Sequence, residues 1–80
     1  MPRTHQLVRT MLACHLDRAV CAIQPWQRLD RDLDLTPLEL VLLALEFEEI
    51  QQVRVSMDGL VGASTVGDLF ALFARALAEK

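Results

Sequence analysis

The sequence predicts one small all-α domain, an irregular four-helix bundle built from three main helices and one short helix. Its 80 residues fit a single domain that spans residues 1–80 and leave no room for a second. Leucine and alanine, which favour helices, are abundant, whereas the aromatic residues that favour strands make up only 5%. With 3 glycines and 3 prolines, the chain also lacks the turn residues of a small β-sandwich or barrel.

The first helix is expected over residues 4–24, with Thr4 as its N-cap. Pro25 disfavours the helical conformation at Gln24, so the helix is expected to end there. The expected buried face of this helix consists of apolar side chains that recur at helical spacing, namely Val8, Leu12, Leu16, Ala19, Val20 and Ile23.

Two cysteines and two histidines fall within this first helix. Seven helical residues would separate Cys14 from Cys21 by about 10 Å, which is too far for a disulfide. Both are therefore expected to be free thiols, and a structural cysteine is usually buried. His5 and His15 lack the spacing of a metal site, so we expect them on the helix surface or at its rim, without partners.

A long connection is expected over residues 25–35, tethered to the core by apolar anchors. Among its aspartates stand Trp26, Leu29, Leu33 and Leu35. The tryptophan follows the expected end of the first helix, and we interpret it as a packing lid over the core.

The second helix has the clearest start signal in the chain. Thr36 is a typical N-cap, Pro37 suits the first helical position, and Glu39 completes a capping box. The helix is expected to run to about Gln51. Its expected core positions are Leu38, Val41, Ala44 or Leu45, and Phe47 or Ile50.

The remaining leucines of this helix, Leu40, Leu42 and Leu43, are more than one buried face needs. The helix must therefore be buried on two sides or present an apolar face to a partner.

Beyond it, residues 53–55 alternate like a strand but have no strand to pair with, so we expect an extended loop. Gly59 and Gly62 leave room for one helical turn at most. The last helix is expected to start at Thr65, with Asp68 in its capping box. Its expected buried face comprises Val66, Leu69, Phe70, Phe73 and Leu77.

The charge distribution excludes some classes of partner. The net charge is −3, with +3 in residues 1–28 and −6 in residues 29–49, so nucleic acid and anionic lipid are not expected partners. The acidic middle either meets a basic partner or is solvated. The start of the chain has no signal-peptide pattern and the longest apolar run, Leu40 to Leu45, is short, so we expect a cytoplasmic protein outside the membrane.

Residues 29–70 resemble the acyl carrier proteins, including the carrier domains of polyketide and nonribosomal peptide assembly. That family typically shows a hydrophobic residue, two variable residues, and then Asp-Leu-Gly-hydrophobic-Asp-Ser-Leu before a helix rich in Leu and Val. Here the stretch reads LDRDLDLTPLELV over residues 29–41, without a gap. The last helix starts with TVGDL, residues 65–69, which is also typical of the family. The resemblance implies an acyl-carrier-like helical fold.

One departure removes the family's chemistry. Carrier proteins attach a 4′-phosphopantetheine arm to the serine of Asp-Ser-Leu, and that position is Pro37 here. Proline has no hydroxyl group, so no phosphodiester can form there and no cofactor is expected. Thr36 carries a hydroxyl, but it is shifted by one residue and is needed as the N-cap, which makes it a poor substitute.

The resemblance also implies that the exposed side of the second helix binds partner enzymes. The family's acidic positions on that side correspond to Glu39, Leu42, Glu48 and Glu49, so leucine replaces acid in the middle. Contacts with a partner are then expected to be more apolar than charged. The expected partner-binding residues are Glu39, Leu42, Leu45, Glu46 and Glu49.

The expected function is that of an acyl-carrier-like module that binds biosynthetic enzymes but carries no thioester. One alternative is a functional acyl carrier protein of fatty-acid, polyketide or related biosynthesis with its arm elsewhere. Another is a small helical dimerisation or regulatory protein, a weak homodimer that uses Leu40, Leu42 and Leu45 as its contact face. No nucleophilic triad, metal site or carboxylate pair is visible, so an enzyme is not expected.

Overall fold

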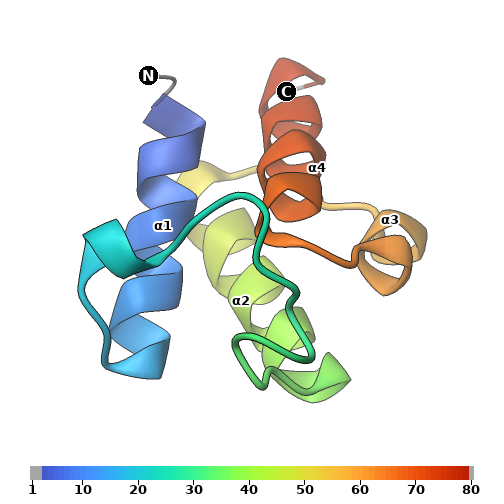
Figure 1. Ribbon diagram of the computed structural model, residues 1–80. Helices are drawn as coiled ribbons and strands as arrows, with labels where there is room; N and C mark the ends of the chain where they lie inside the picture. The colour runs from blue at the N-terminus through green and yellow to red at the C-terminus, as the bar shows by residue number, and fades with distance from the viewer. Residues whose placement is uncertain (1–2, 80) are drawn as a thin grey trace.

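The computed structural model describes residues 3–79 and is an all-α bundle, as the composition predicts (Figure 1). Its helices are α1 (Arg3–Leu16), the 3-10 helix η1 (Val20–Ala22), α2 (Pro37–Gln51), α3 (Met57–Gly62) and α4 (Val66–Ala78). Three are long and α3 is a short one, which confirms the expected architecture. The six residues of α3 exceed the single turn that its two glycines were expected to allow, so that limit was wrong. The extended pairing found in this part of the chain is a single bridge between Arg28 and Thr65.

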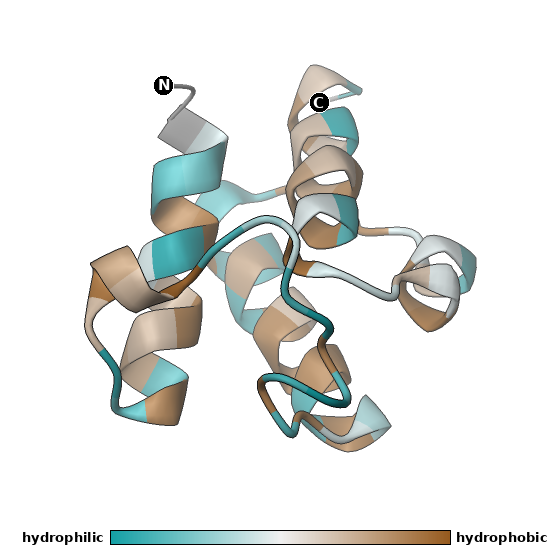
Figure 2. Cartoon of the chain, in the orientation of Figure 1, coloured by the Kyte–Doolittle hydropathy of each residue, from teal (hydrophilic) through white to brown (hydrophobic). Residues whose placement is uncertain are grey.

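α1 and α4 pack against each other and run in opposite directions, while α2 passes behind them in the view of Figure 1. α3 lies to one side, against α2 and α4. The segment between η1 and α2 runs across the front of α2 in this view. It is mostly hydrophilic in Figure 2, interrupted by apolar residues. Those residues, Leu29, Leu33 and Leu35, are buried as expected.

The core is formed by apolar side chains from every long helix and from the connections. Its centre is the pair Phe47 and Phe73, whose rings stack with centroids 4.4 Å apart and join α2 to α4. Both rings are fully buried, so this pair fixes the distance between the two helices.

The first helix is shorter than expected, because α1 ends at Leu16 and not at Gln24. Asp17 takes a left-handed conformation with φ 56°, the amide of Arg18 donates to the carbonyl of Ala13, and the amide of Asp17 donates to that of Cys14. This is a Schellman ending, which closes the helix well before Pro25 is reached.

The ends of the predicted first helix therefore need correction. The helix begins at Arg3, so Thr4 lies inside its first turn and is not the N-cap. After the turn, Ala19 is exposed while Ile23 is buried from the connection that follows η1. Cys14 and Cys21 are free thiols, as expected, but both are exposed where burial was expected.

Trp26 does not cover the core, because 72% of its surface is exposed. The backbone on either side of it is tied to the start of α4. The carbonyl of Pro25 accepts from the amide of Gly67, and the carbonyl of Gln27 accepts from the amide of Val66. With both flanking peptide groups turned toward α4, the indole is left outside, so the packing-lid prediction was wrong.

The buried side of α2 also differs in part from the prediction. Leu43, Ala44 and Phe47 are buried, whereas Leu38 is exposed. Nine residues make two and a half helical turns, so Leu38 and Phe47 necessarily lie on opposite sides of the helix. Of the two open choices, the structure selects Ala44 and Phe47 for the core.

Among residues 3–79, no helix has the length and apolar character needed to cross a membrane.

Candidate functional site

The start of α2 has the geometry that the sequence predicts. The Thr36 hydroxyl accepts from the amide of Glu39 at 3.2 Å, and the Glu39 carboxylate accepts from the amide of Thr36 at 3.1 Å. Pro37 is the first helical residue. The capping box is complete, so the Thr36 hydroxyl is engaged by the backbone of its own helix.

Glu39 has a second partner that sequence reasoning missed. The Nε2 atom of His15, in the last turn of α1, lies 2.8 Å from a carboxylate oxygen of Glu39. This hydrogen bond, together with the Thr36 amide, lowers the pKa of Glu39 below its ordinary value. The pair links the end of α1 to the start of α2. The two residues are 24 positions apart in the sequence, so no local sequence pattern predicts their contact.

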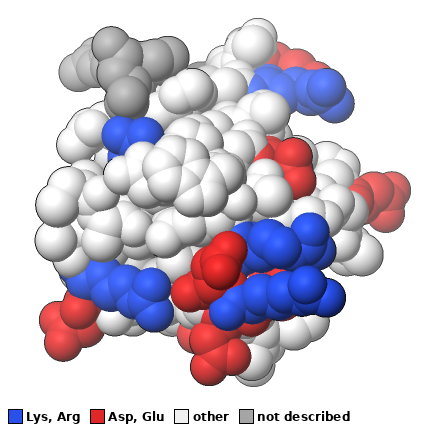
Figure 3. Space-filling view, viewed as in Figure 1, with Lys and Arg blue, Asp and Glu red and all other residues white. Residues whose placement is uncertain are grey.

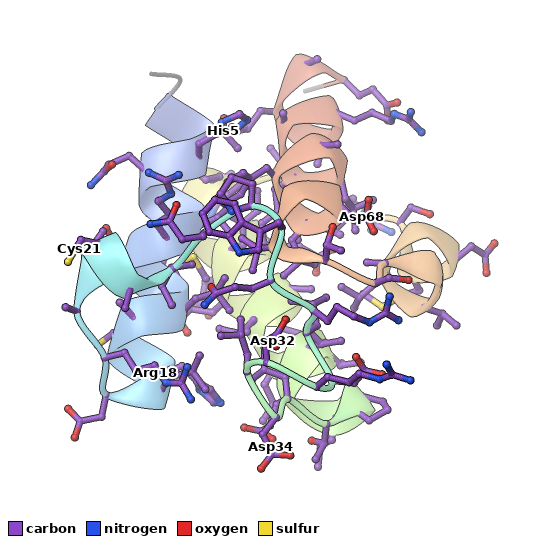
Figure 4. The ribbon with its side chains drawn as sticks, in the orientation of Figure 1. His5, Arg18, Cys21, Asp32, Asp34 and Asp68 are labelled. Carbon is purple, nitrogen blue, oxygen red and sulfur yellow. The ribbon has the colours of Figure 1, made fainter. Side chains whose placement is uncertain are left out.

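His5 also has a neighbour that the sequence did not reveal. Its ring stacks on Phe70 of α4, with centroids 4.5 Å apart, and Figure 4 shows His5 on the side of α1 that faces α4. The Arg9 guanidinium lies 5.6 Å from the centre of the same Phe70 ring. This cluster joins α1 to α4 and has a structural role.

The side of α2 opposite the core is apolar. Leu38, Leu42 and Leu45 follow at intervals of four and three residues, so they share one side of the helix, and they are 68%, 52% and 49% exposed. We call these three residues the leucine face. The expected exposure of Leu42 and Leu45 is confirmed, and Leu38 extends their surface by one turn. Leu40 instead packs partly against the core and does not belong to this face.

Carboxylates border the leucine face. Glu46 and Glu49 are exposed and follow Leu42 and Leu45 by four residues, and Glu39 stands one turn from the helix start. The neighbouring Glu48 differs from them, because its carboxylate accepts from the amide of Val55 at 2.7 Å and so holds the loop after α2. α2 contains four glutamates and no lysine or arginine.

The face shown in Figure 3 is less uniform in charge. On the face shown in Figure 3, acidic and basic side chains lie next to one another along the lower edge. Figure 4 places Asp32 and Asp34 in the connection that leads to α2. The carboxylate of Asp32 accepts from the amide of Arg28 at 2.7 Å, so it closes a turn. The acidity of α2 therefore differs from the mixed charge of this other face.

An apolar hollow of about 260 Å³ opens beside the start of α2, and the sequence did not predict it. Pro37, Leu40 and Val41 form one wall, and Leu60 and Val61 of α3 form another. Its polar lining consists of Arg28, Asp30 and Ser64.

No family model matches this chain, and a search of curated proteins gives no match either. The acyl-carrier resemblance therefore stays a prediction based on the residues that carry it.

Proposed function

We propose that this chain is an acyl-carrier-like interaction module that binds a partner protein, a biosynthetic enzyme, through α2 and carries no phosphopantetheine arm. The observation that carries the proposal is the leucine face, Leu38, Leu42 and Leu45, on a helix whose other side is already buried in the core. Burying one leucine side chain is worth about 1.5–3 kcal/mol, so covering this face can contribute strongly to binding. The two acidic residues beside it, Glu46 and Glu49, add a preference for a basic partner.

The geometry at the start of α2 supports the absence of an arm. Pro37 occupies the position of the family's serine and has no hydroxyl to accept a phosphodiester. The Thr36 hydroxyl is bound to the amide of Glu39, and its use as a nucleophile would cost the helix its cap.

The backbone before α2 supports the resemblance itself. Asp34 has φ 54°, a left-handed conformation that glycine adopts at little cost. In the family's Asp-Leu-Gly motif, glycine stands at this position. The backbone conformation that favours glycine at this position is therefore present in this chain, although the residue here is aspartate.

The mass of the intact protein tests the absence of an arm. Protein purified from its native host is expected to have the mass of the bare polypeptide. A mass increase that matches phosphopantetheine, at any residue, would favour the alternative of a functional acyl carrier protein.

A charge-insertion variant tests the leucine face. Leu42→Glu combined with Leu45→Glu should leave the helical circular dichroism intact and abolish capture of partner proteins from a lysate of the native host. The matched control is Gln6→Glu with Thr10→Glu, which adds two carboxylates to exposed positions of α1. If the leucine variant unfolds, or captures the same proteins as the control, the proposed docking role is wrong.

A further inference from the structure

A second apolar surface lies outside α2, on η1 and the segment that follows it. Residues 19–27 include no charged residue. The exposed residues of this stretch are Ala19, Cys21, Ala22, Pro25 and Trp26. We call these five residues the η1 patch. They belong neither to the core nor to the leucine face, so no contact within the bundle accounts for them.

The η1 patch lies away from α2. In Figure 1 η1 stands beside α1, on the side of α1 that is turned away from α4. Figure 4 shows Cys21 at this outer edge of the molecule. In Figure 3 the surface over η1 and the stretch after it is mostly white, which marks residues without charge. A protein bound to this surface would therefore leave α2 free.

The backbone that carries the exposed Trp26 is fixed in place. The carbonyl groups of its two neighbours, Pro25 and Gln27, accept from amides at the start of α4. Little conformational freedom remains to be lost when the indole is covered, which favours binding. An exposed tryptophan on a fixed backbone is typical of the residues that contribute most to a protein interface.

The η1 patch combines one bulky side chain with a flat area. Trp26 is the bulky side chain, and the small side chains of Ala19, Cys21 and Ala22 form the flat area. In a contact with two-fold symmetry, each residue of one copy meets a residue of the other copy, and the reverse contact also forms. The tryptophan of each copy can then lie on the small side chains of the other. A surface that has both parts is complementary to itself.

The charges that border the η1 patch also permit a second copy of the chain. In the sequence Asp17 and Arg18 precede the patch, and Arg28 follows it. Because these residues carry both signs, a two-fold contact can place an acidic side chain near a basic one. α2 differs, since it contains four glutamates and no lysine or arginine, and two copies would repel each other there.

We infer that a second copy of this chain covers the η1 patch, with Trp26 of each copy packed on Cys21 and Ala22 of the other. The inference is independent of the proposed function, because the dimer leaves both leucine faces open to a partner. A standard interface has about 20–30 residues on each side, and the η1 patch has far fewer exposed residues. The dimer is therefore weak and depends on protein concentration.

Sedimentation velocity of the full chain between about 10 μM and about 1 mM tests for this dimer. The sedimentation coefficient of the wild type should rise with concentration. Trp26→Ala should weaken dimerisation about thirtyfold, the effect typical of a dominant interface residue. Ala22→Glu puts a charge in the flat area and should abolish dimerisation. The matched control, Leu42→Glu, puts the same charge on the leucine face and should dimerise like the wild type.

The two free cysteines provide a second readout. Both are exposed, but Cys21 belongs to the η1 patch whereas Cys14 lies on α1 outside it. A short pulse of iodoacetamide followed by mass spectrometry measures the alkylation rate of each thiol. As the protein concentration rises, the rate at Cys21 should fall, because the second copy covers it. The rate at Cys14 should stay constant, and in Ala22→Glu both rates should stay constant.

A monomer at every concentration would overturn the inference, as would a dimer that Ala22→Glu leaves intact. A dimer abolished by Leu42→Glu would assign the contact to α2 and would overturn it as well. If Trp26→Ala loses its helical circular dichroism, the alkylation rates of the wild type and of Ala22→Glu decide the question. The proposed function fails separately, since Ala22→Glu should capture the same partner proteins as the wild type through its unchanged leucine face.

Discussion

Asp34 holds a left-handed backbone conformation that glycine adopts at lower cost. A left-handed conformation costs about 1–2 kcal/mol for most residues with a β-carbon, and aspartate lowers that cost through local hydrogen bonding. Asp34→Ala should therefore lower the free energy of unfolding by about 1 kcal/mol. Asp34→Gly should preserve or raise it, as measured by urea denaturation. Equal stabilities of the alanine and glycine variants would mean that the left-handed conformation is absent in solution.

Glu39 should make the free energy of unfolding depend on pH in the acidic range. Its pKa is lowered in the folded state by His15 and the Thr36 amide, so it contributes stability above the ordinary carboxyl pKa. That contribution is lost as the pH falls through the lowered value. Asp68 behaves in the same way, because the amides of Ser64 and Thr65 lower its pKa.

Urea denaturation at several pH values between about 5 and 3 measures this dependence. The unfolding free energy should fall across this range in the wild type and fall less in Glu39→Gln. Glu46→Gln, on the same helix, serves as the control and should keep the wild-type slope. If both variants keep that slope, the His15–Glu39 contact does not persist in solution.

At the scale of the element, α2 begins with Thr36 and Pro37, where the proposed resemblance would place Asp-Ser. Thr36→Asp with Pro37→Ser recreates Asp-Ser-Leu and should turn the protein into a substrate of a broad phosphopantetheinyl transferase. The stability cost should be about 1 kcal/mol or less, since aspartate is also a good N-cap and only the conformational preference of proline is lost. Mass spectrometry after incubation with coenzyme A measures the modification.

The control for this experiment is Thr36→Asp with Pro37→Ala, which has the same cap but no hydroxyl at position 37. It should stay unmodified. A folded Asp-Ser variant that the transferase does not modify would show that more than the serine separates this chain from the carriers.

The helices also show which local sequence signals are sufficient to predict where a helix begins or ends. α2 and α4 begin where the sequence predicts, because their capping boxes involve residues only three positions apart. The end of α1 was misplaced because Pro25 marks the last position a helix could reach, whereas Asp17 already ends it. A helix end marked by aspartate is harder to recognise in a sequence than one marked by glycine. The sequence therefore did not clearly indicate the Schellman ending at Asp17.

At the scale of the whole molecule, stability depends on the stacked pair Phe47 and Phe73. Replacing a buried phenylalanine with alanine typically costs about 3–5 kcal/mol, and small domains have only about 5–15 kcal/mol in total. Phe73→Ala should therefore lower the urea midpoint severely. Leu38→Ala, at an exposed position, should change the unfolding free energy by about 0.5 kcal/mol or less. A similar loss in both variants would contradict the core described here.

The sequence by itself determined the helical class, the starts of α2 and α4, the buried leucines of the connection and the absence of a hydroxyl at position 37. These features follow from composition and from neighbours a few residues apart. Only the tertiary structure decided that Leu38 is exposed and Leu43 buried, that Trp26 lies outside the core, and that His15 meets Glu39. The apolar hollow beside the start of α2 likewise needs side chains from α3. Whether an apolar side chain is buried depends on what packs against it, and those neighbours come from distant parts of the chain.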